Sequence, residues 1–129
     1  MSYSSREVVR LCPDVSFRQL QWWDEQGLVT PERGPRRLYT ESHLFEIRLT
    51  SELRRKKVTF RVIRLVLHRL RKGRYPQPVV GNHRRYLIVD PARGDIQLED
   101  DPATVCRVVA SVPRPVVLVE MPTIKSEVQ

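Results

Sequence analysis

Residues with the chemistry to bind a polyanion lie on one side of a short segment, residues 15–28. They carry guanidinium, amide and indole groups: Arg18, Gln19, Gln21 and Trp22. Guanidinium and amide groups present forks of donors and acceptors that match phosphate oxygens and base edges. The alternative is an ordinary solvated helix face, and these residue types alone favour neither interpretation.

The segment that carries them is predicted to be a capped, one-sided helix over residues 16–26. Ser16 is a good N-cap, because its hydroxyl accepts a free amide hydrogen of the first turn. Phe17, Leu20 and Trp23 recur at spacings of three, so we expect them to share a buried face. Gly27 supplies the left-handed residue that ends such a helix.

A shorter helix is predicted before it, from Tyr3 to Leu11, with Ser4 or Ser5 as its cap. Pro13 is then expected to end this helix, since proline cannot continue a helical hydrogen-bond ladder. Two short helices joined by such a turn form a helix-turn-helix, which also occurs in proteins that never bind DNA.

A basic hairpin is predicted next, with its loop at residues 30–38. Residues 28–29 and 38–39 are expected to pair as two short strands around Pro31, Gly34 and Pro35. Three arginines lie in the loop: Arg33, Arg36 and Arg37. Such a hairpin after a helix-turn-helix is typical of a wing that contacts the phosphate backbone. We favour this interpretation over a solvated loop because of the neighbouring helix.

Two longer helices follow, with Thr40 capping the first and Thr59 starting the second. The residues expected on their buried sides are Leu44, Ile47 and Leu53, then Phe60, Ile63, Val66, Leu67 and Leu70. Basic clusters at residues 54–57 and 71–74 are interpreted as solvated helix ends, where the helix dipole favours positive charge.

The charge of the chain is concentrated in its first part. Residues 1–74 contain 17 Lys and Arg against 8 Asp and Glu, a net charge of +9. Residues 75–129 contain 6 against 7, a net charge of −1. This asymmetry suggests that the first part meets a polyanion and the second part does something else.

The second part is predicted to be a linker at residues 75–83 and a small β-β-α-β module at residues 84–122, with residues 123–129 as a frayed tail. Strands are expected over residues 85–89, 95–99 and 116–119, with a helix between the last two. Asp101 caps that helix and Pro102 takes its first position. A valine stripe gives the helix its apolar side: Val105, Val108, Val109 and Val112. The last strand is interpreted as the centre of the module's sheet, and pairing across a dimer is the alternative.

An enzyme, a cofactor site and a metal site are not expected. The histidines lie on separate elements: His43, His68 and His83. No nucleophile–base pair, glycine-rich phosphate loop or metal-ligand spacing occurs. Asp100 and Asp101 are better explained by a helix cap than by a paired-carboxylate site.

Cys12 and Cys106 are far apart in the sequence and are interpreted as reduced thiols of a cytoplasmic protein. No apolar run has the length that a bilayer requires, and no charged start precedes an apolar stretch. A membrane span and a secretory signal are therefore not expected.

Residues 3–71 resemble the MerR family of winged-helix transcription regulators. The resemblance rests on VSFRQLQWWDEQGLVTP at residues 15–31, RLYTE at residues 37–41 and the helical run to Leu67. It implies that the second helix enters the major groove and that the wing holds the flanking backbone. By position, Arg18 resembles the base-reading residue and Arg37 the wing arginine. The other matches are Ser16 as the cap, Leu20 and Trp23 in the core, Gln21 and Trp22 as the backbone-contacting pair and Tyr39 as the packing tyrosine.

Several residues depart from the family pattern. Gln21 replaces an arginine and removes a charge-assisted phosphate contact, which shifts the expected specificity onto Arg18 and Gln19. The turn at residues 12–15 is one residue longer, and Lys57 stands where the family commonly has glycine. The linker prolines stop the family's long dimerisation helix. This chain also lacks the cysteines that metal-sensing members carry near that helix.

The sequence therefore predicts an α+β protein, a winged helix-turn-helix over residues 1–74 followed by the small module. Its expected function is sequence-specific binding of double-stranded DNA as a transcriptional regulator, in the cytoplasm at the nucleoid. A homodimer is expected, with a protein or small-molecule effector at the module. The alternative is a DNA-binding antitoxin or adaptor whose module binds another protein.

Overall fold

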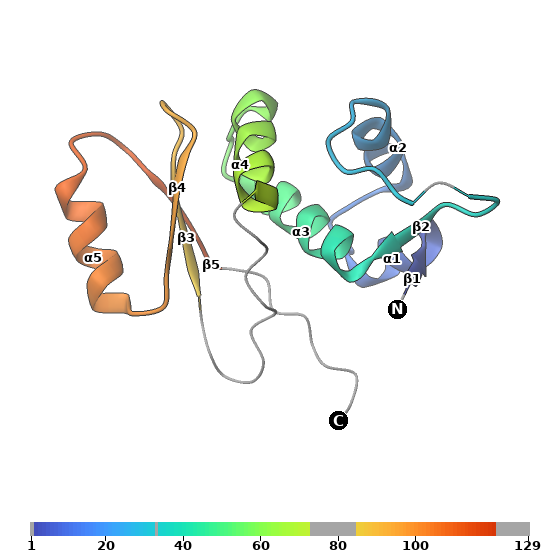
Figure 1. The fold of residues 1–129 in the computed structure, drawn as a ribbon, viewed down its shortest axis with the longest axis horizontal. Coiled ribbons are helices and arrows are strands. Elements are labelled where there is room, and N and C mark those ends of the chain that lie inside the picture. Colours follow the sequence, from blue (N-terminus) through green and yellow to red (C-terminus); the bar gives the residue numbers. More distant parts are fainter. Residues whose placement is uncertain (1, 33, 73–84, 121–129) are drawn as a thin grey trace. The chain divides into compact units, whose positions relative to one another are not determined.

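The computed structural model describes residues 2–32, 34–72 and 85–120 (Figure 1). The chain divides into two compact units, Met1–Ser51 and Glu52–Gln129, which are described separately. The first unit contains β1 (Ser2–Ser4), α1 (Ser5–Leu11), α2 (Phe17–Glu25), β2 (Leu38–Thr40) and most of α3 (Glu41–Arg55). The second contains the end of α3, then α4 (Phe60–Lys72), β3 (Tyr86–Asp90), β4 (Asp95–Glu99), α5 (Pro102–Ser111) and β5 (Val117–Glu120). Four predicted features lie outside the described residues: Arg33, His83, the linker at 75–83 and the tail at 123–129.

Residues 2–4 form a strand, where the sequence analysis expected the first turn of a helix from Tyr3. β1 pairs antiparallel with β2, so that Tyr3 lies opposite Tyr39. The helix begins only at Ser5, because Ser4 and Glu7 form a capping box at its start. The Ser4 hydroxyl accepts from the Glu7 amide at 3.2 Å, and the Glu7 carboxylate accepts from the Ser4 amide at 3.1 Å. These hydrogen bonds hold the pKa of Glu7 below its usual value.

The expected pairing of residues 28–29 with residues 38–39 is wrong. β2 takes β1 as its partner, and the hairpin retains one isolated bridge between Glu32 and Leu38. Leu28 and Val29 instead lie in a bend of the chain, and both side chains are buried. The Leu28 amide is already used, since it donates to the Trp23 carbonyl at 2.9 Å and closes the end of α2.

Helices α2 and α3 end in the same motif, with a left-handed residue one position past the cap. In α2 this residue is Gly27, at φ 68°, as the sequence predicts. In α3 it is Lys57, at φ 64°. Its amide donates to the Arg54 carbonyl, and the Val58 amide donates to the Leu53 carbonyl. Lys57, at the position where the resemblance implies glycine, therefore adopts the left-handed backbone conformation that favours glycine.

Replacing Lys57 with glycine is expected to raise the free energy of unfolding by about 0.5–1 kcal/mol. A left-handed non-glycine residue costs roughly 1–2 kcal/mol, and glycine returns part of this through its freer unfolded chain. Urea denaturation followed by circular dichroism measures the change.

Gly27→Ala is the matched variant with the opposite sign, because a Cβ at Gly27 meets no atom within 4 Å and only the backbone is strained. It should lower the free energy of unfolding by about the same 0.5–1 kcal/mol. Equal signs for the two variants would show that backbone strain is not what distinguishes these positions.

Both longer helices begin at the predicted threonines. The Thr40 hydroxyl accepts from the His43 amide at 3.2 Å, while Nδ1 of His43 accepts from the Thr40 amide at 3.0 Å. The Thr59 hydroxyl accepts from the Val62 amide at 3.4 Å. All the predicted apolar residues of α3 and α4 are buried except Phe60, which is half-buried beneath the Arg54 guanidinium.

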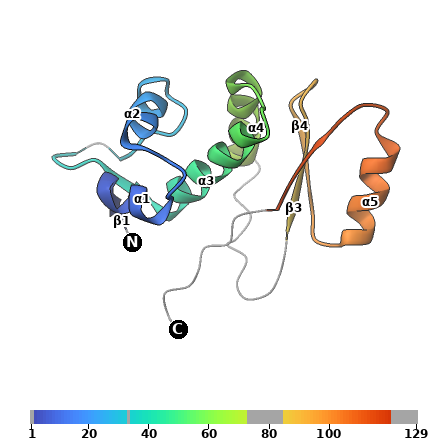
Figure 2. The same cartoon turned by 180° about the vertical axis from the view of Figure 1, so that it is seen from behind.

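The second unit contains a three-stranded antiparallel sheet in the order β4-β3-β5. The central strand is β3, whose Leu87, Ile88 and Val89 are all buried. The prediction that the last strand is the centre of the sheet is therefore wrong: β5 is an edge among the described strands. α5 lies along one face of the sheet in Figures 1 and 2. Its start is capped as predicted, since the Asp101 carboxylate accepts from the Ala103 amide at 3.3 Å.

The end of β3 is held by an ion pair between Asp90 and Arg114, with the carboxylate 2.7 Å from the guanidinium. Burial alone would raise the pKa of Asp90. The Arg114 guanidinium and the amides of Ala92 and Arg93 outweigh burial and hold this pKa below its usual value. A carboxylate with a lowered folded-state pKa stabilises the fold above its unfolded pKa, and this stability is lost as the pH falls.

We expect Asp90→Asn to reduce the acid sensitivity of the protein. In the wild type, protonation of Asp90 removes the ion pair once the pH falls below the ordinary carboxyl range, about pH 4. The urea midpoint, measured between about pH 7 and pH 3, should therefore fall less in the variant. Arg114→Gln should flatten the profile in the same way, and an unchanged profile in both variants would argue against the ion pair.

Candidate nucleic-acid interface

Helix α2 is fixed at its start by a capping box made from two of the predicted contact residues. The Ser16 hydroxyl accepts from the Gln19 amide at 3.1 Å, and Oε1 of Gln19 accepts from the Ser16 amide at 2.9 Å. This confirms Ser16 as the N-cap. In this structure both side chains are thus engaged in the cap, so they orient the helix.

The outer face of α2 is wider and more aromatic than the sequence analysis expected. Leu20 and Trp23 are buried, but Phe17, predicted beside them, is 54% exposed. The cause is helical rotation: at about 100° per residue, Phe17 and Trp23 are about 120° apart around the axis. Spacings of three therefore drift off one face within two turns. Phe17 is the feature of this surface that the sequence analysis missed.

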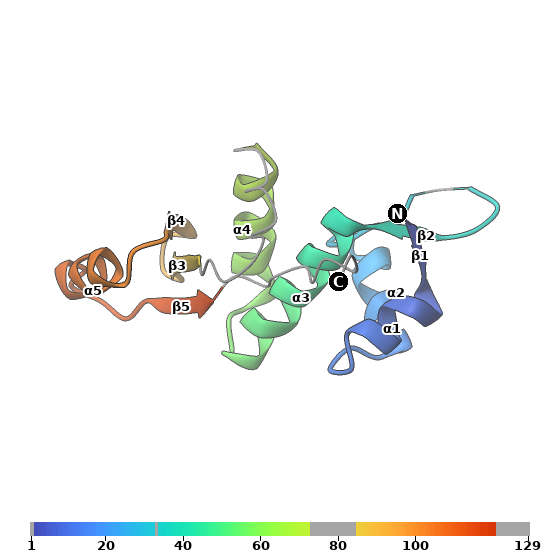
Figure 3. The same ribbon diagram turned by 90° about the horizontal axis from the view of Figure 1, so that it is seen from below.

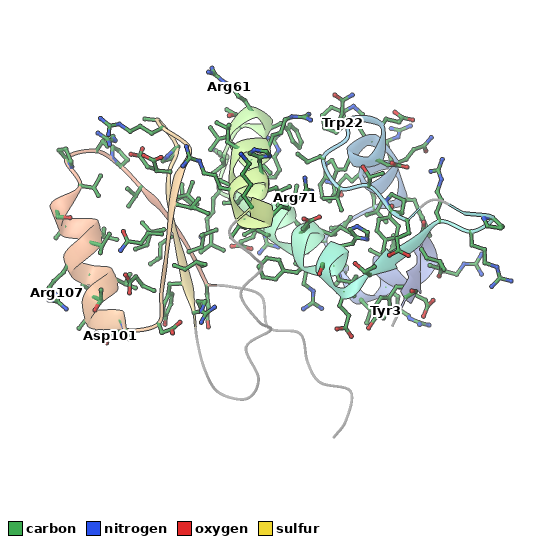
Figure 4. The ribbon with its side chains drawn as sticks, in the orientation of Figure 1. Tyr3, Trp22, Arg61, Arg71, Asp101 and Arg107 are labelled. Carbon is green, nitrogen blue, oxygen red and sulfur yellow. The ribbon has the colours of Figure 1, made fainter. Side chains whose placement is uncertain are left out.

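Four side chains share this outer face, within about 140° around the helix axis: Phe17, Arg18, Gln21 and Trp22. Trp22 is 40% exposed and extends from α2 (Figure 4). Nε2 of Gln21 donates to the Glu25 carboxylate at 3.3 Å along the helix. The face thus combines one guanidinium with two aromatic rings, a set that suits bases and phosphates.

The loop between α2 and β2 projects from the two-stranded sheet (Figure 3). It carries Arg36 and Arg37, both exposed. Arg37 lies 3.5 Å from the Asp24 carboxylate near the end of α2. This ion pair connects the loop to the same helix that presents the outer face.

Tyr39 lies in β2 and is buried, so its side chain is not exposed to a ligand. Burial and the nearby Asp24 carboxylate raise its pKa. Its ring meets the edge of the His43 ring, with centroids 6.0 Å apart. His43 is half-buried and takes part in the cap of α3.

The sequence model of the MerR HTH family regulatory proteins matches residues 3–70. The chain belongs to the MerR family. The match covers α1, α2 and their turn, the loop, and α3 and α4 to Leu70. This is a family of DNA-binding regulators and not of enzymes. No curated protein matches the chain significantly.

Cys12 is buried and Cys106 exposed, and both are free thiols. Within residues 2–32, 34–72 and 85–120, no group of three or more His, Cys, Asp and Glu side chains could hold a metal ion. No helix in the described part of this MerR-family chain is long and apolar enough to cross a membrane.

Proposed function

We propose that this protein is a sequence-specific regulator of transcription that binds double-stranded DNA through α2 and the loop at residues 30–38. The observation that carries this proposal is the exposed face of α2, presented by a fully capped helix within a MerR-family helix-turn-helix. The net charge of +9 over residues 1–74 supplies the non-specific attraction to phosphates.

The proposed roles of the residues follow from their positions. Arg18 reads a base edge in the major groove, and Trp22 and Gln21 contact the backbone beside it. Arg36 and Arg37 contact phosphates from the loop, as we also propose for Arg33. Ser16, Gln19 and Tyr39 support the interface by holding the helix cap and the base of the loop.

We further propose a homodimer that binds an inverted repeat. Dimeric readers place equivalent helices about one DNA turn apart, so each copy contacts one half-site. In this division, residues 1–74 bind DNA and residues 84–122 form a module for dimerisation, partner or effector binding. Such a protein acts in the cytoplasm, associated with the nucleoid.

Selection of bound DNA from a random double-stranded pool, followed by measurement of the mass of the complex, tests this proposal. The expected result is a palindromic consensus bound by two chains. If the bound DNA remains random in sequence and binding is lost steeply as the salt concentration rises, the protein binds DNA non-specifically and the proposal of sequence-specific regulation is wrong.

Phe17 is expected to contact a thymine methyl group, because it is an exposed apolar side chain beside the proposed base-reading arginine. Replacing that thymine with uracil in the selected site removes one methyl group, about 0.8 kcal/mol or roughly fourfold in affinity. Titration by fluorescence anisotropy should show this loss in the wild type and in Trp22→Ala. In Phe17→Ala the loss should be absent, and a uracil effect that persists there would assign the methyl contact to another residue.

A DNA-binding antitoxin or adaptor is the second candidate, supported by β5, which is an edge among the described strands and is suited to strand addition. Native mass spectrometry of the full chain purified from its own cells tests it. A stoichiometric complex with an unrelated chain would favour this candidate, and the palindromic consensus alone would not.

A further inference from the structure

The two edges of the sheet in the second unit differ in character. The β4 edge carries Asp95 and Glu99 at its ends, Asp95 being 3.3 Å from Arg69. Two antiparallel copies of β4 centred on Gln97 would place Asp95 opposite Glu99, which are like charges. Acidic residues at an edge discourage pairing with another strand. β4 is therefore a protected edge.

The β5 edge has less of this protection, because Glu120 at its end is the one charged residue of the strand. Residues 116–119 are all apolar, and Leu118 is 41% exposed. Among the described strands β5 pairs only with β3, so its other side presents backbone donors and acceptors. An apolar, nearly uncharged edge is a template for a further strand.

We propose that β5 pairs antiparallel with β5 of a second copy of this chain, joining two three-stranded sheets into one six-stranded sheet. The inference rests on the proposed function, because a reader of an inverted repeat needs a two-fold contact.

Charge selects a second copy as the partner. Antiparallel pairing brings the start of one β5 beside the end of the other, so the Arg114–Asp90 ion pair of each chain lies toward the Glu120 end of its mate. Between these ends only apolar residues face each other. Residues 75–129 have a net charge of −1, whereas two copies of residues 1–74 repel each other at +9 each. The second part is therefore where two copies can meet at little electrostatic cost.

The register of the sheet provides a matched pair of variants. Leu118 and Gln97 both lie opposite Ile88, one on each edge, and both are exposed. Leu118→Lys places a cation on the proposed interface, and Gln97→Lys places the same cation in the same row on the protected edge. Neither side chain is part of the core, so circular dichroism should show both variants folded.

Sedimentation equilibrium of the full chain without DNA measures the outcome. We expect the wild type and Gln97→Lys to have twice the monomer mass of 15.2 kDa, and Leu118→Lys to raise the dimer dissociation constant at least tenfold. Hydrogen exchange at residues 117–120 should slow with protein concentration in the wild type and in Gln97→Lys, and should not do so in Leu118→Lys.

Three results would overturn the inference. They are a monomeric wild type, a dimer equally stable in both variants, and exchange protection at β5 that does not depend on concentration, which would indicate cover by the same chain. The proposed function fails separately: a chain that dimerises through β5 but selects no DNA sequence would refute the regulator and leave the interface standing. If two Leu118→Lys chains still dimerise and bind a palindrome, the regulator would stand and the β5 interface would be refuted.

Discussion

Replacing Trp23 with alanine is expected to lower the free energy of unfolding by about 3–5 kcal/mol. Trp23 is 2% exposed, so its indole is fully packed inside the first unit. Removing the indole leaves a cavity that rigid neighbours fill only in part. Because a domain of this size has about 5–15 kcal/mol of stability, the variant should approach unfolding at physiological temperature.

The adjacent residue is the control. Trp22 is 40% exposed, and substitutions at such positions usually change stability by about 0.5 kcal/mol or less. Trp22→Ala should therefore fold normally and lose DNA affinity. Urea denaturation must be followed by circular dichroism, since each variant removes one of the two tryptophans. Equal destabilisation of the two variants would mean that the inner and outer faces of α2 have been assigned wrongly.

Local signals in the sequence predicted the ends of the helices well. Ser16, Thr40 and Asp101 cap the helices at which they were placed, and Gly27 is left-handed. Each of these signals depends on a few neighbouring residues and their own hydrogen bonds, so the sequence alone contains it. The predicted burial of Phe17 was wrong, because a spacing of three residues was assumed to stay on one helix face over two turns.

Pairing between distant segments could not be predicted in this way. Nothing in residues 2–4 indicates a strand, because β1 exists only through β2, whose paired residues lie 34 to 38 positions away in the sequence. The order of the second sheet is a similar case. An apolar run such as residues 116–119 is equally compatible with a strand at the centre of the sheet and with an edge strand that pairs across a dimer. Its place in the sheet depends on where β3 and β4 lie.

The candidate interface was predicted as a set of residue types, and the structure divides that set by role. Arg18, Trp22 and Arg36 are exposed, while Tyr39 is buried and Gln19 folds back onto the cap. Sequence position could not make this division, since the same amide group serves a helix cap or a base edge depending on its rotamer. Two arginine variants, Arg18→Ala and Arg37→Ala, test whether this surface binds DNA.

Arg18→Ala and Arg37→Ala are expected to weaken DNA binding in different ways. Without Arg18, discrimination at one base pair of the selected site should fall by about 1–3 kcal/mol, with the other positions unchanged. Without Arg37, all sequences should bind more weakly by a similar factor, and the slope of log K against log salt should decrease by about 1. Anisotropy titrations on the site and its single-base variants, at several salt concentrations, separate the two effects.

The ion pair with Asp24 makes the Arg37 result open to a second explanation, and Asp24→Ala resolves it. If Arg37 acts by tethering the loop to α2, removing Asp24 should weaken binding as much as removing Arg37. If Arg37 acts by contacting a phosphate, Asp24→Ala releases the guanidinium and removes a nearby negative charge, so affinity should stay equal or rise. The phosphate role predicts the second result. An unchanged base preference in Arg18→Ala, together with an unchanged salt slope in Arg37→Ala, would show that DNA docks on a different face.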